Sequence, residues 1–249
     1  MKSVASKIKP ASGFSHFFHI GLLLLLPTLM FVLVRIKLTP FAAVLILLSK
    51  WRMFAVRPRY WPANIRANAV DMIVGLSFLI FMTNTNAMSW QLLWAVLYGV
   101  WLTVIKPGSG MLKVIAQGAI GQTLGLFALF MAFGGANIYI LVISVWVVCY
   151  LSARHFLTAF DESHISFLAH TWGYFAAAMT WVLSHWLLFY GLLAQTTLLL
   201  TVISFSLATI YYLDHTDRLS LLLRRQFVFI MIAIIVVVLV FSDWGDKTI

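Results

Sequence analysis

The feature that most constrains this chain is a series of apolar runs of about 20 residues, which recurs from one end of the sequence to the other. A helix of this length crosses the hydrocarbon core of a bilayer. Short polar connections separate the runs, and no polar block is long enough for a separate soluble domain. The sequence therefore predicts an all-α, polytopic integral membrane bundle in which residues 1–249 form a single transmembrane domain.

Nine transmembrane helices are expected, seven of them from clean apolar segments. These seven lie at residues 69–82, 90–105, 111–133, 138–157, 165–190, 196–213 and 227–241. The other two form an N-terminal pair at residues 14–34 and 38–49, and the second of these is short for a crossing. It crosses if it extends to residue 56 with Lys50 and Arg52 snorkelling, and is otherwise re-entrant or interfacial.

Composition supports the membrane assignment. The chain is 63% hydrophobic and only 10% charged, whereas a soluble domain typically carries about 25% charged residues. Its net charge is +10, which in a soluble protein would favour nucleic-acid binding. Here the cations lie at span ends and in short loops, as the positive-inside rule describes. We therefore expect no nucleic-acid partner.

A basic and aromatic segment, residues 50–66, lies between two apolar regions and contains no acid. It is predicted to be an interfacial loop on the anionic, cytoplasmic face of the bilayer. With two arginines near the C-terminus, its cations are the predicted contacts to anionic lipid: Lys50, Arg52, Arg57, Arg59, Arg66, Arg224 and Arg225.

The loops alternate in charge, which predicts the orientation. Residues 83–89, 134–137 and 191–195 carry no charge, while residues 106–113, 154–164 and 214–225 carry cations. The charged loops are expected inside and the short C-terminal tail, residues 242–249, outside, in the plasma (inner) membrane. The short basic N-terminal tail, residues 1–13, favours an uncleaved signal-anchor with its N-terminus inside.

Asp71 is the sharpest candidate within a span, because burial in a bilayer makes an ionisable group costly. One interpretation is a proton- or cation-linked carboxylate on a transport path. The other, which we favour, is an interfacial acid paired with Arg66 or another loop cation.

The segment around Gln117 and Gln122 is unusually polar and small for a span. Gly121 and Gly125 have the small-xxx-small spacing that permits close helix contact, and the two amides can hydrogen-bond across helices. Packing is the favoured interpretation. The alternative is a polar translocation path that includes Gln117, Gln122 and Asp71.

Acidic residues and histidines on the predicted inner face are candidate catalytic groups: Asp161, His164, Asp214 and Asp217. Carboxylates and histidines of this kind can bind a divalent metal. No tight ligand spacing is present, so no metal site and no cofactor are assigned. Helix capping and the helix dipole explain the same residues and are the favoured interpretation.

These observations predict a non-enzymatic membrane component, either transporter-like or a subunit of a larger membrane complex. The alternative is an inner-leaflet lipid-modifying enzyme, similar in activity to a prenyl or phospholipid transferase, that uses the Asp and His residues of the inner face. The single cysteine, Cys149, is expected to be a small buried apolar residue.

Overall fold

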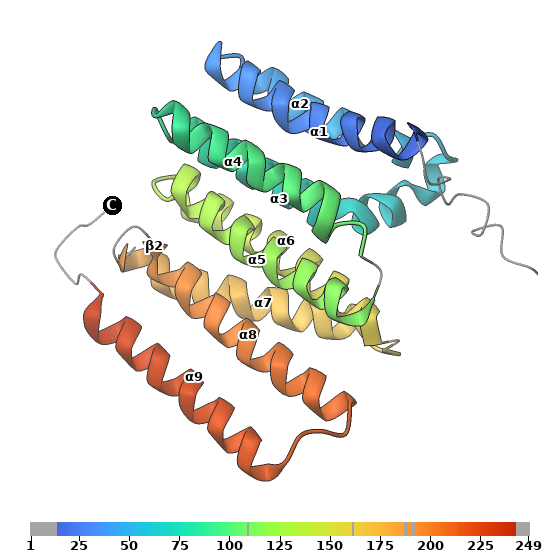
Figure 1. The fold of residues 1–249 in the computed structure, drawn as a ribbon. Coiled ribbons are helices and arrows are strands. Elements are labelled where there is room, and N and C mark those ends of the chain that lie inside the picture. The colour runs from blue at the N-terminus through green and yellow to red at the C-terminus, as the bar shows by residue number, and fades with distance from the viewer. Residues whose placement is uncertain (1–13, 109, 161, 187–188, 191–192, 243–249) are drawn as a thin grey trace, which may run out of the picture.

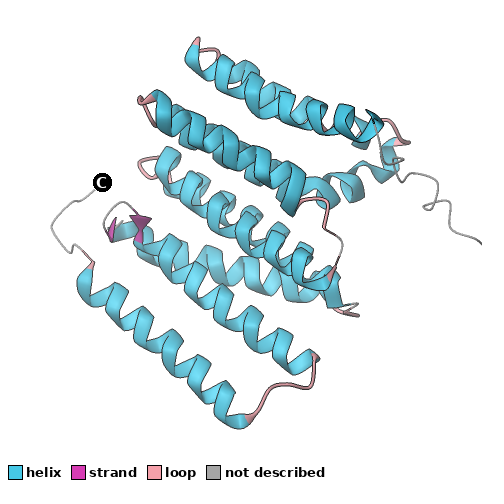
Figure 2. Ribbon diagram, in the orientation of Figure 1, coloured by secondary structure: helices cyan, strands magenta, loops and turns pink. Residues whose placement is uncertain are grey.

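The computed structural model describes residues 14–108, 110–160, 162–186, 189–190 and 193–242. These residues form nine α-helices and one small hairpin, as Figure 2 shows. The helices are α1 Phe14–Arg35, α2 Thr39–Leu48, α3 Trp61–Thr83, α4 Met88–Val100, α5 Met111–Phe133, α6 Ile138–Leu157, α7 Ile165–Leu183, α8 Gln195–His215 and α9 Leu221–Phe241.

Shorter elements connect or extend these helices. Three-residue 3₁₀ turns are η2 Trp51–Met53, η3 Pro58–Tyr60, η5 Thr158–Phe160 and η6 Ser184–Trp186, and α4 continues into the π-helical turn η4 Trp101–Ile105. Strands β1 Phe189–Tyr190 and β2 Leu193–Ala194 pair antiparallel, Phe189 with Ala194 and Tyr190 with Leu193.

Consecutive helices run in opposite directions, from α1 and α2 at one edge to α9 at the other (Figure 1), and α5 packs on α3 and α6 rather than on α4. One end of the bundle holds the start of α1 and the connections α2–α3, α4–α5, α6–α7 and α8–α9. We call it the basic end, because its connections and the helix ends beside them carry most of the described lysines and arginines. The other end, here the opposite end, holds the α1–α2 and α3–α4 turns and the end of α9.

Length and apolarity confirm the predicted polytopic membrane bundle. Among the described residues, six segments are long and apolar enough to cross a bilayer: Pro58–Thr83, Met88–Ile105, Met111–Phe133, Ile138–Phe160, Gln195–His215 and Leu221–Phe241. Two shorter apolar helices, Ile20–Arg35 and Thr39–Leu48, precede them. The chain is therefore an integral membrane protein whose outer surface lies in lipid.

Helix α2 occupies most of the first half of residues 38–56, the segment whose crossing of the bilayer the sequence left open. Its 10 residues span about 15 Å, roughly half of the hydrocarbon thickness. It nevertheless runs antiparallel to α1 and returns the chain to the basic end (Figure 1). The turns η2 and η3 then lead into α3.

Three predicted boundaries differ from the structure by six residues or more. Helix α3 begins at Trp61 rather than residue 69, with Pro62 in its first turn, a position where a missing N–H costs nothing. Helix α9 begins at Leu221 rather than residue 227, and the Ser220 side chain caps it by accepting from Leu223 N. Helix α7 ends at Leu183 rather than residue 190, because the chain continues as η6 and β1.

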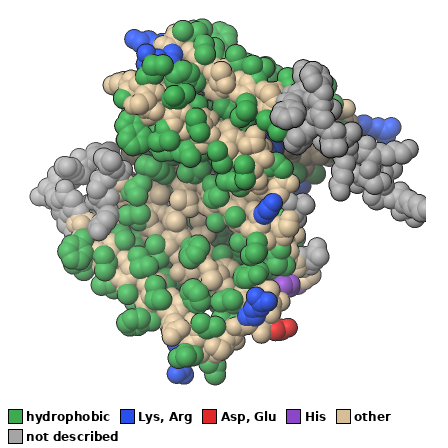
Figure 3. Space-filling model, viewed as in Figure 1, with side chains coloured by type: hydrophobic (Ala, Val, Ile, Leu, Met, Phe, Trp, Pro, Cys, Tyr) green, Lys and Arg blue, Asp and Glu red, His purple; other side chains and the backbone are tan. Residues whose placement is uncertain are grey.

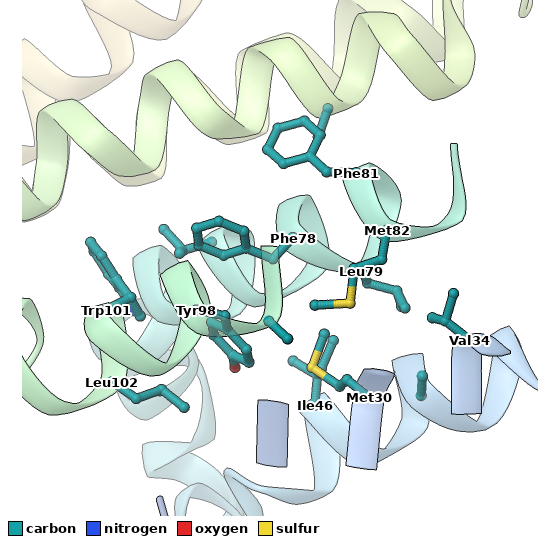
Figure 4. Close-up of a cluster of buried hydrophobic side chains, with 14 of the residues drawn as sticks. Met30, Val34, Ile46, Phe78, Leu79, Phe81, Met82, Tyr98, Trp101 and Leu102 are labelled. Carbon is teal, nitrogen blue, oxygen red and sulfur yellow. The ribbon is translucent and has the colours of Figure 1, made fainter. Parts of the chain in front are cut away.

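The largest apolar core joins α1, α2, α3 and α4 (Figure 4). Tyr98, Phe81 and Met30 are among its fully buried side chains. A second cluster joins α5, α6, α7 and α8 and contains the buried, free Cys149, as expected.

Close helix contact at the two small residues of α5 is also confirmed. A Cβ at Gly121 would lie 2.7 Å from Val70 Cγ1 of α3, and one at Gly125 would lie 2.7 Å from Ile73 Cγ2 and 2.9 Å from Val148 Cγ1. Only glycine therefore lets α3 and α6 approach α5 this closely.

Candidate functional site

Asp71 lies on α3, about 15 Å along the helix from its start, and its side chain is only 10% exposed. Its Oδ1 accepts a hydrogen bond from Trp101 Nε1 at 2.8 Å. Its Oδ2 pairs with Lys106 Nζ at 2.6 Å and also with Lys50 Nζ. These four residues, Lys50, Asp71, Trp101 and Lys106, are called the Asp71 cluster below. Both ion pairs found among the described residues belong to it.

Lys50 reaches Asp71 because α2 stops early. The Ser49 hydroxyl donates to Ile46 O at 2.6 Å, and Lys50 follows in a turn that leads into η2. Asn64 Nδ2 donates to Met53 O at 3.2 Å, which ties η2 to α3. Lys50 therefore lies against the side of α3, where its side chain is only 9% exposed.

Trp101 and Lys106 reach the same carboxylate because α4 ends in a π-helical turn. Lys106 N donates to Trp101 O at 2.9 Å, five residues back. In an α-helix, residues five apart point about 140° away from each other. The wider π-turn brings them onto the same side, and π-turns occur frequently at functional sites.

The cluster contains two cationic side chains and one anionic side chain. A buried charge is costly unless it is paired, and here one carboxylate serves two ammonium groups. Burial first, and then the nearby Lys106, lowers the pKa of Lys50 from 10.5 to about 7. Burial also lowers the pKa of Lys106. Near neutral pH the cluster is therefore poised to lose a proton.

Gln117 of α5 continues this polar network. Its Nε2 donates to three carbonyls that follow the π-turn: Ile105 O at 2.8 Å, Gly108 O at 3.0 Å and Lys106 O at 3.2 Å. Its Oε1 lies 3.0 Å from His155 Nε2 of α6. Because that oxygen can only accept, the His155 Nε2–H is the donor. Gln117 therefore connects the backbone of Lys106 to α6.

Gln122, the third member of the predicted transport path, has different neighbours. Its Oε1 accepts from Trp172 Nε1 of α7 at 2.9 Å. Its Nε2 is buried and has no hydrogen-bond partner among the described residues. The structure thus places Asp71 and Gln117 in one network and Gln122 in another, between α5 and α7. Their role in transport stays a prediction.

Three of the four candidate catalytic residues lie in the part of the chain that the structure describes. His164, Asp214 and Asp217 are exposed, and Asp161 lies outside the described residues. The acid that makes a specific contact in this region is Glu162, which accepts a hydrogen bond from Tyr211. Within the described residues, no group of three or more His, Cys, Asp or Glu side chains could hold a metal.

Most of the predicted lipid contacts lie on the surface. Arg52, Arg57, Arg59, Arg224 and Arg225 are exposed, and Arg66 is half-buried. Lys50 differs, because it is buried against Asp71.

The expected partner of Asp71 was Arg66 or another loop cation, and the structure shows loop cations. Arg66 donates to Pro62 O at 3.0 Å, and the loop cations Lys50 and Lys106 pair with Asp71 instead. Arg66 precedes Asp71 by five residues on the same α-helix, so it points about 140° away. In the sequence, the partners of Asp71 are indicated by Lys50 and Lys106, the lysines that follow the neighbouring helices α2 and α4.

No protein-family model, no curated protein and no solved structure matches this chain.

Proposed function

We propose that this protein is a transporter-like, non-enzymatic membrane component, and that the Asp71 cluster is the site where it binds a proton together with a small anion. The observation that carries the proposal is the sharing of one buried carboxylate by two lysines. Ionisable residues within membrane segments are rare and are functional-site candidates for that reason.

The charge of the Asp71 cluster couples the binding of a proton to the binding of an anion. With all three groups ionised, the site carries one surplus positive charge in a buried place, which is costly. Two events remove that charge: a lysine releases a proton, or an anion binds. Each event removes the need for the other, so proton loss and anion binding compete at the same lysines.

We further propose that the basic end faces the cytoplasm and that the end of α9 faces outward, across the plasma membrane. The lysines and arginines of the basic end support this orientation. Arg52, Arg57, Arg59, Arg66, Arg224 and Arg225 then lie near anionic lipid headgroups.

The test is anion-driven proton movement in proteoliposomes. Vesicles that enclose a pH-sensitive dye are given external chloride or inorganic phosphate, and the internal pH is followed. Wild-type protein is expected to move protons when one of these anions is supplied. Empty vesicles provide the baseline, and wild-type vesicles that match this baseline with both anions would refute proton transport coupled to either.

A matched pair of variants links the flux to the cluster. Lys106→Gln removes the surplus charge but leaves the Lys50–Asp71 pair, so the protein is expected to fold and the flux to fall at least tenfold. Lys113→Gln makes the same change on an exposed residue of the same end and is expected to leave the flux unchanged. Equal flux in the two variants would remove the Asp71 cluster from the mechanism.

The predicted alternative, a subunit of a larger membrane complex, is separated by native mass spectrometry of protein released gently from its membrane. A specifically retained partner protein would favour the subunit role. Protein that is released alone and still moves protons would favour the transporter.

A further inference from the structure

At the opposite end of the bundle, a pocket of about 240 Å³ lies between the α1–α2 turn and the α3–α4 turn. We call it the opposite-end pocket. Its described lining is Val34, Arg35, Lys37, Thr39, Thr83, Thr85, Asn86 and Gln91. Two of these residues are cationic, five carry neutral polar side chains, and none is Asp or Glu. Pockets for drug-sized ligands measure about 300–1,000 Å³, so this pocket suits a smaller group.

The Gln91 side chain lines the opposite-end pocket and is held in place by hydrogen bonds. It is 6% exposed, and its Nε2 donates to Thr85 O at 2.7 Å and to Met82 O at 3.1 Å. With the amide nitrogen held in this way, Oε1 is directed towards Arg35, whose Nη1 lies 3.5 Å away. The α3–α4 turn therefore positions a cation that belongs to α1.

Lys37 provides the second cation from an unusual backbone. Its φ is +61°, in the left-handed region that favours glycine. It follows the end of α1, where Leu38 N donates to Leu33 O at 2.8 Å. Glycine is the usual residue at such a helix end. A lysine in this backbone conformation is strained. Figure 3 shows basic side chains on the surface at this turn.

We propose that the opposite-end pocket binds a phosphate-type dianion. An arginine presents a planar fork that matches phosphate oxygens, a lysine adds a point charge, and the side chains of Thr39 and Asn86 can donate to the remaining oxygens. The Thr83 and Thr85 hydroxyls already donate to Ile80 O and Phe81 O. The two positive charges match a phosphate monoester, which carries about −1.5 to −2 at neutral pH, better than a singly charged carboxylate. This site is independent of the Asp71 cluster and of the proposed transport.

The phosphate group has two possible sources, a free ion or the monoester headgroup of phosphatidic acid. The pocket lies at the ends of apolar helices, where a lipid headgroup is within reach. Binding is therefore measured in two arms. Calorimetry follows inorganic phosphate added to protein in phosphatidylcholine nanodiscs, and native mass spectrometry follows phosphatidic acid retained from mixed vesicles of phosphatidylcholine and phosphatidic acid.

Wild-type protein is expected to bind in at least one arm. Arg35→Gln with Lys37→Gln is expected to weaken that binding at least tenfold, whereas Arg224→Gln with Arg225→Gln, an equal change of charge at the basic end, leaves it unchanged. Binding of the free ion alone identifies an ion site, and retention of the lipid alone identifies a headgroup site. Lack of binding in both arms, or equal weakening by the two double variants, overturns the proposal.

The variant Lys37→Gly separates loss of binding from loss of folding. Glycine relieves the left-handed backbone strain, so the variant is expected to melt at or above the wild-type temperature. It also removes one of the two charges and is expected to bind more weakly. A stable Lys37→Gly protein that binds as well as the wild type would remove Lys37 from the site.

Discussion

The two basic sites at the ends of the α1–α4 region differ in what neutralises them. In the Asp71 cluster, a carboxylate is built into the fold, and the Lys50 and Asp71 side chains are only 9% and 10% exposed. In the opposite-end pocket, Arg35 and Lys37 are exposed and no described lining residue is acidic. A buried cation requires a partner within the chain, whereas an exposed one can take its partner from outside.

An apolar layer separates the two sites. Figure 4 shows Trp101, which binds Asp71, at one side of the cluster and Val34, which lines the opposite-end pocket, at the other. Tyr98, Phe78, Ile46, Met30 and Met82 lie between them. The sites are therefore not joined by a polar path through this core.

The largest predicted effect comes from removing the built-in carboxylate. Asp71→Ala leaves Lys50 buried without its partner and is expected to lower the free energy of unfolding by about 3–5 kcal/mol. Arg35→Gln, on the exposed site, is expected to change it by no more than about 0.5 kcal/mol. Unfolding in detergent, titrated with dodecyl sulfate, compares the two. Similar losses for both variants would show that the two sites do not differ in this way.

A smaller effect is expected at Gln117, which supports the cluster through the backbone. Gln117→Leu removes the donor to Ile105 O, Lys106 O and Gly108 O and is expected to cost about 1–3 kcal/mol, the usual penalty for unsatisfied buried groups. Gln122→Leu is the control within α5. It removes an amide nitrogen that already lacks a described partner, at the expense of one hydrogen bond from Trp172. The Gln117 variant should unfold first in the same titration.

The apolar layer between the sites is tested at Gly75. An added Cβ would lie 2.8 Å from the Tyr98 hydroxyl and 3.0 Å from Ile46 Cγ2. Gly75→Ala is therefore expected to destabilise the protein by about 1–3 kcal/mol through overpacking. Gly110→Ala, where no atom lies within 4 Å of the added Cβ, is the control. Equal melting temperatures for the two variants would argue against tight packing of this layer.

The last prediction is a dependence of stability on pH that comes from Lys50 of the Asp71 cluster. The pKa of Lys50 is lowered to about 7 in the folded protein, so the unfolded chain binds more protons between this value and about 10.4. Stability from this group therefore rises as the pH rises through that interval. The melting temperature of the wild type should gain more between pH 7 and pH 9.5 than that of Lys50→Met. Parallel curves would contradict the lowered pKa.

The sequence predicts the bundle well because its signal is local. Apolar runs and charged connections specify where each helix lies, and the segments at residues 111–133 and 138–157 match α5 and α6 at both ends. It also singles out Asp71 as a costly residue within a span. The partners of Asp71 depend on which neighbouring helices end at its level, and this is a property of packing. Sequence proximity suggested Arg66, but helix geometry directs that side chain elsewhere.

The opposite-end pocket gave a still weaker signal. Arg35 and Lys37 are two ordinary loop cations in the sequence, and Gln91 is one amide in an apolar run. Only the antiparallel arrangement of α1–α2 and α3–α4 brings them together. The left-handed φ of Lys37 has no counterpart in the sequence pattern, because any lysine near a helix end looks the same.

The π-turn at the end of α4 determines where Lys106 lies relative to Trp101. Returning this turn to α-helical geometry changes the register by one residue, which rotates everything beyond it by about 100° around the helix axis. Such a rotation would carry the Lys106 ammonium away from Asp71 while Trp101, at the start of the turn, keeps its hydrogen bond. The same step would withdraw the Lys106 carbonyl from Gln117 and so reach α6 through His155. The backbone hydrogen bond from Lys106 N to Trp101 O therefore helps to keep two ammonium groups at one carboxylate.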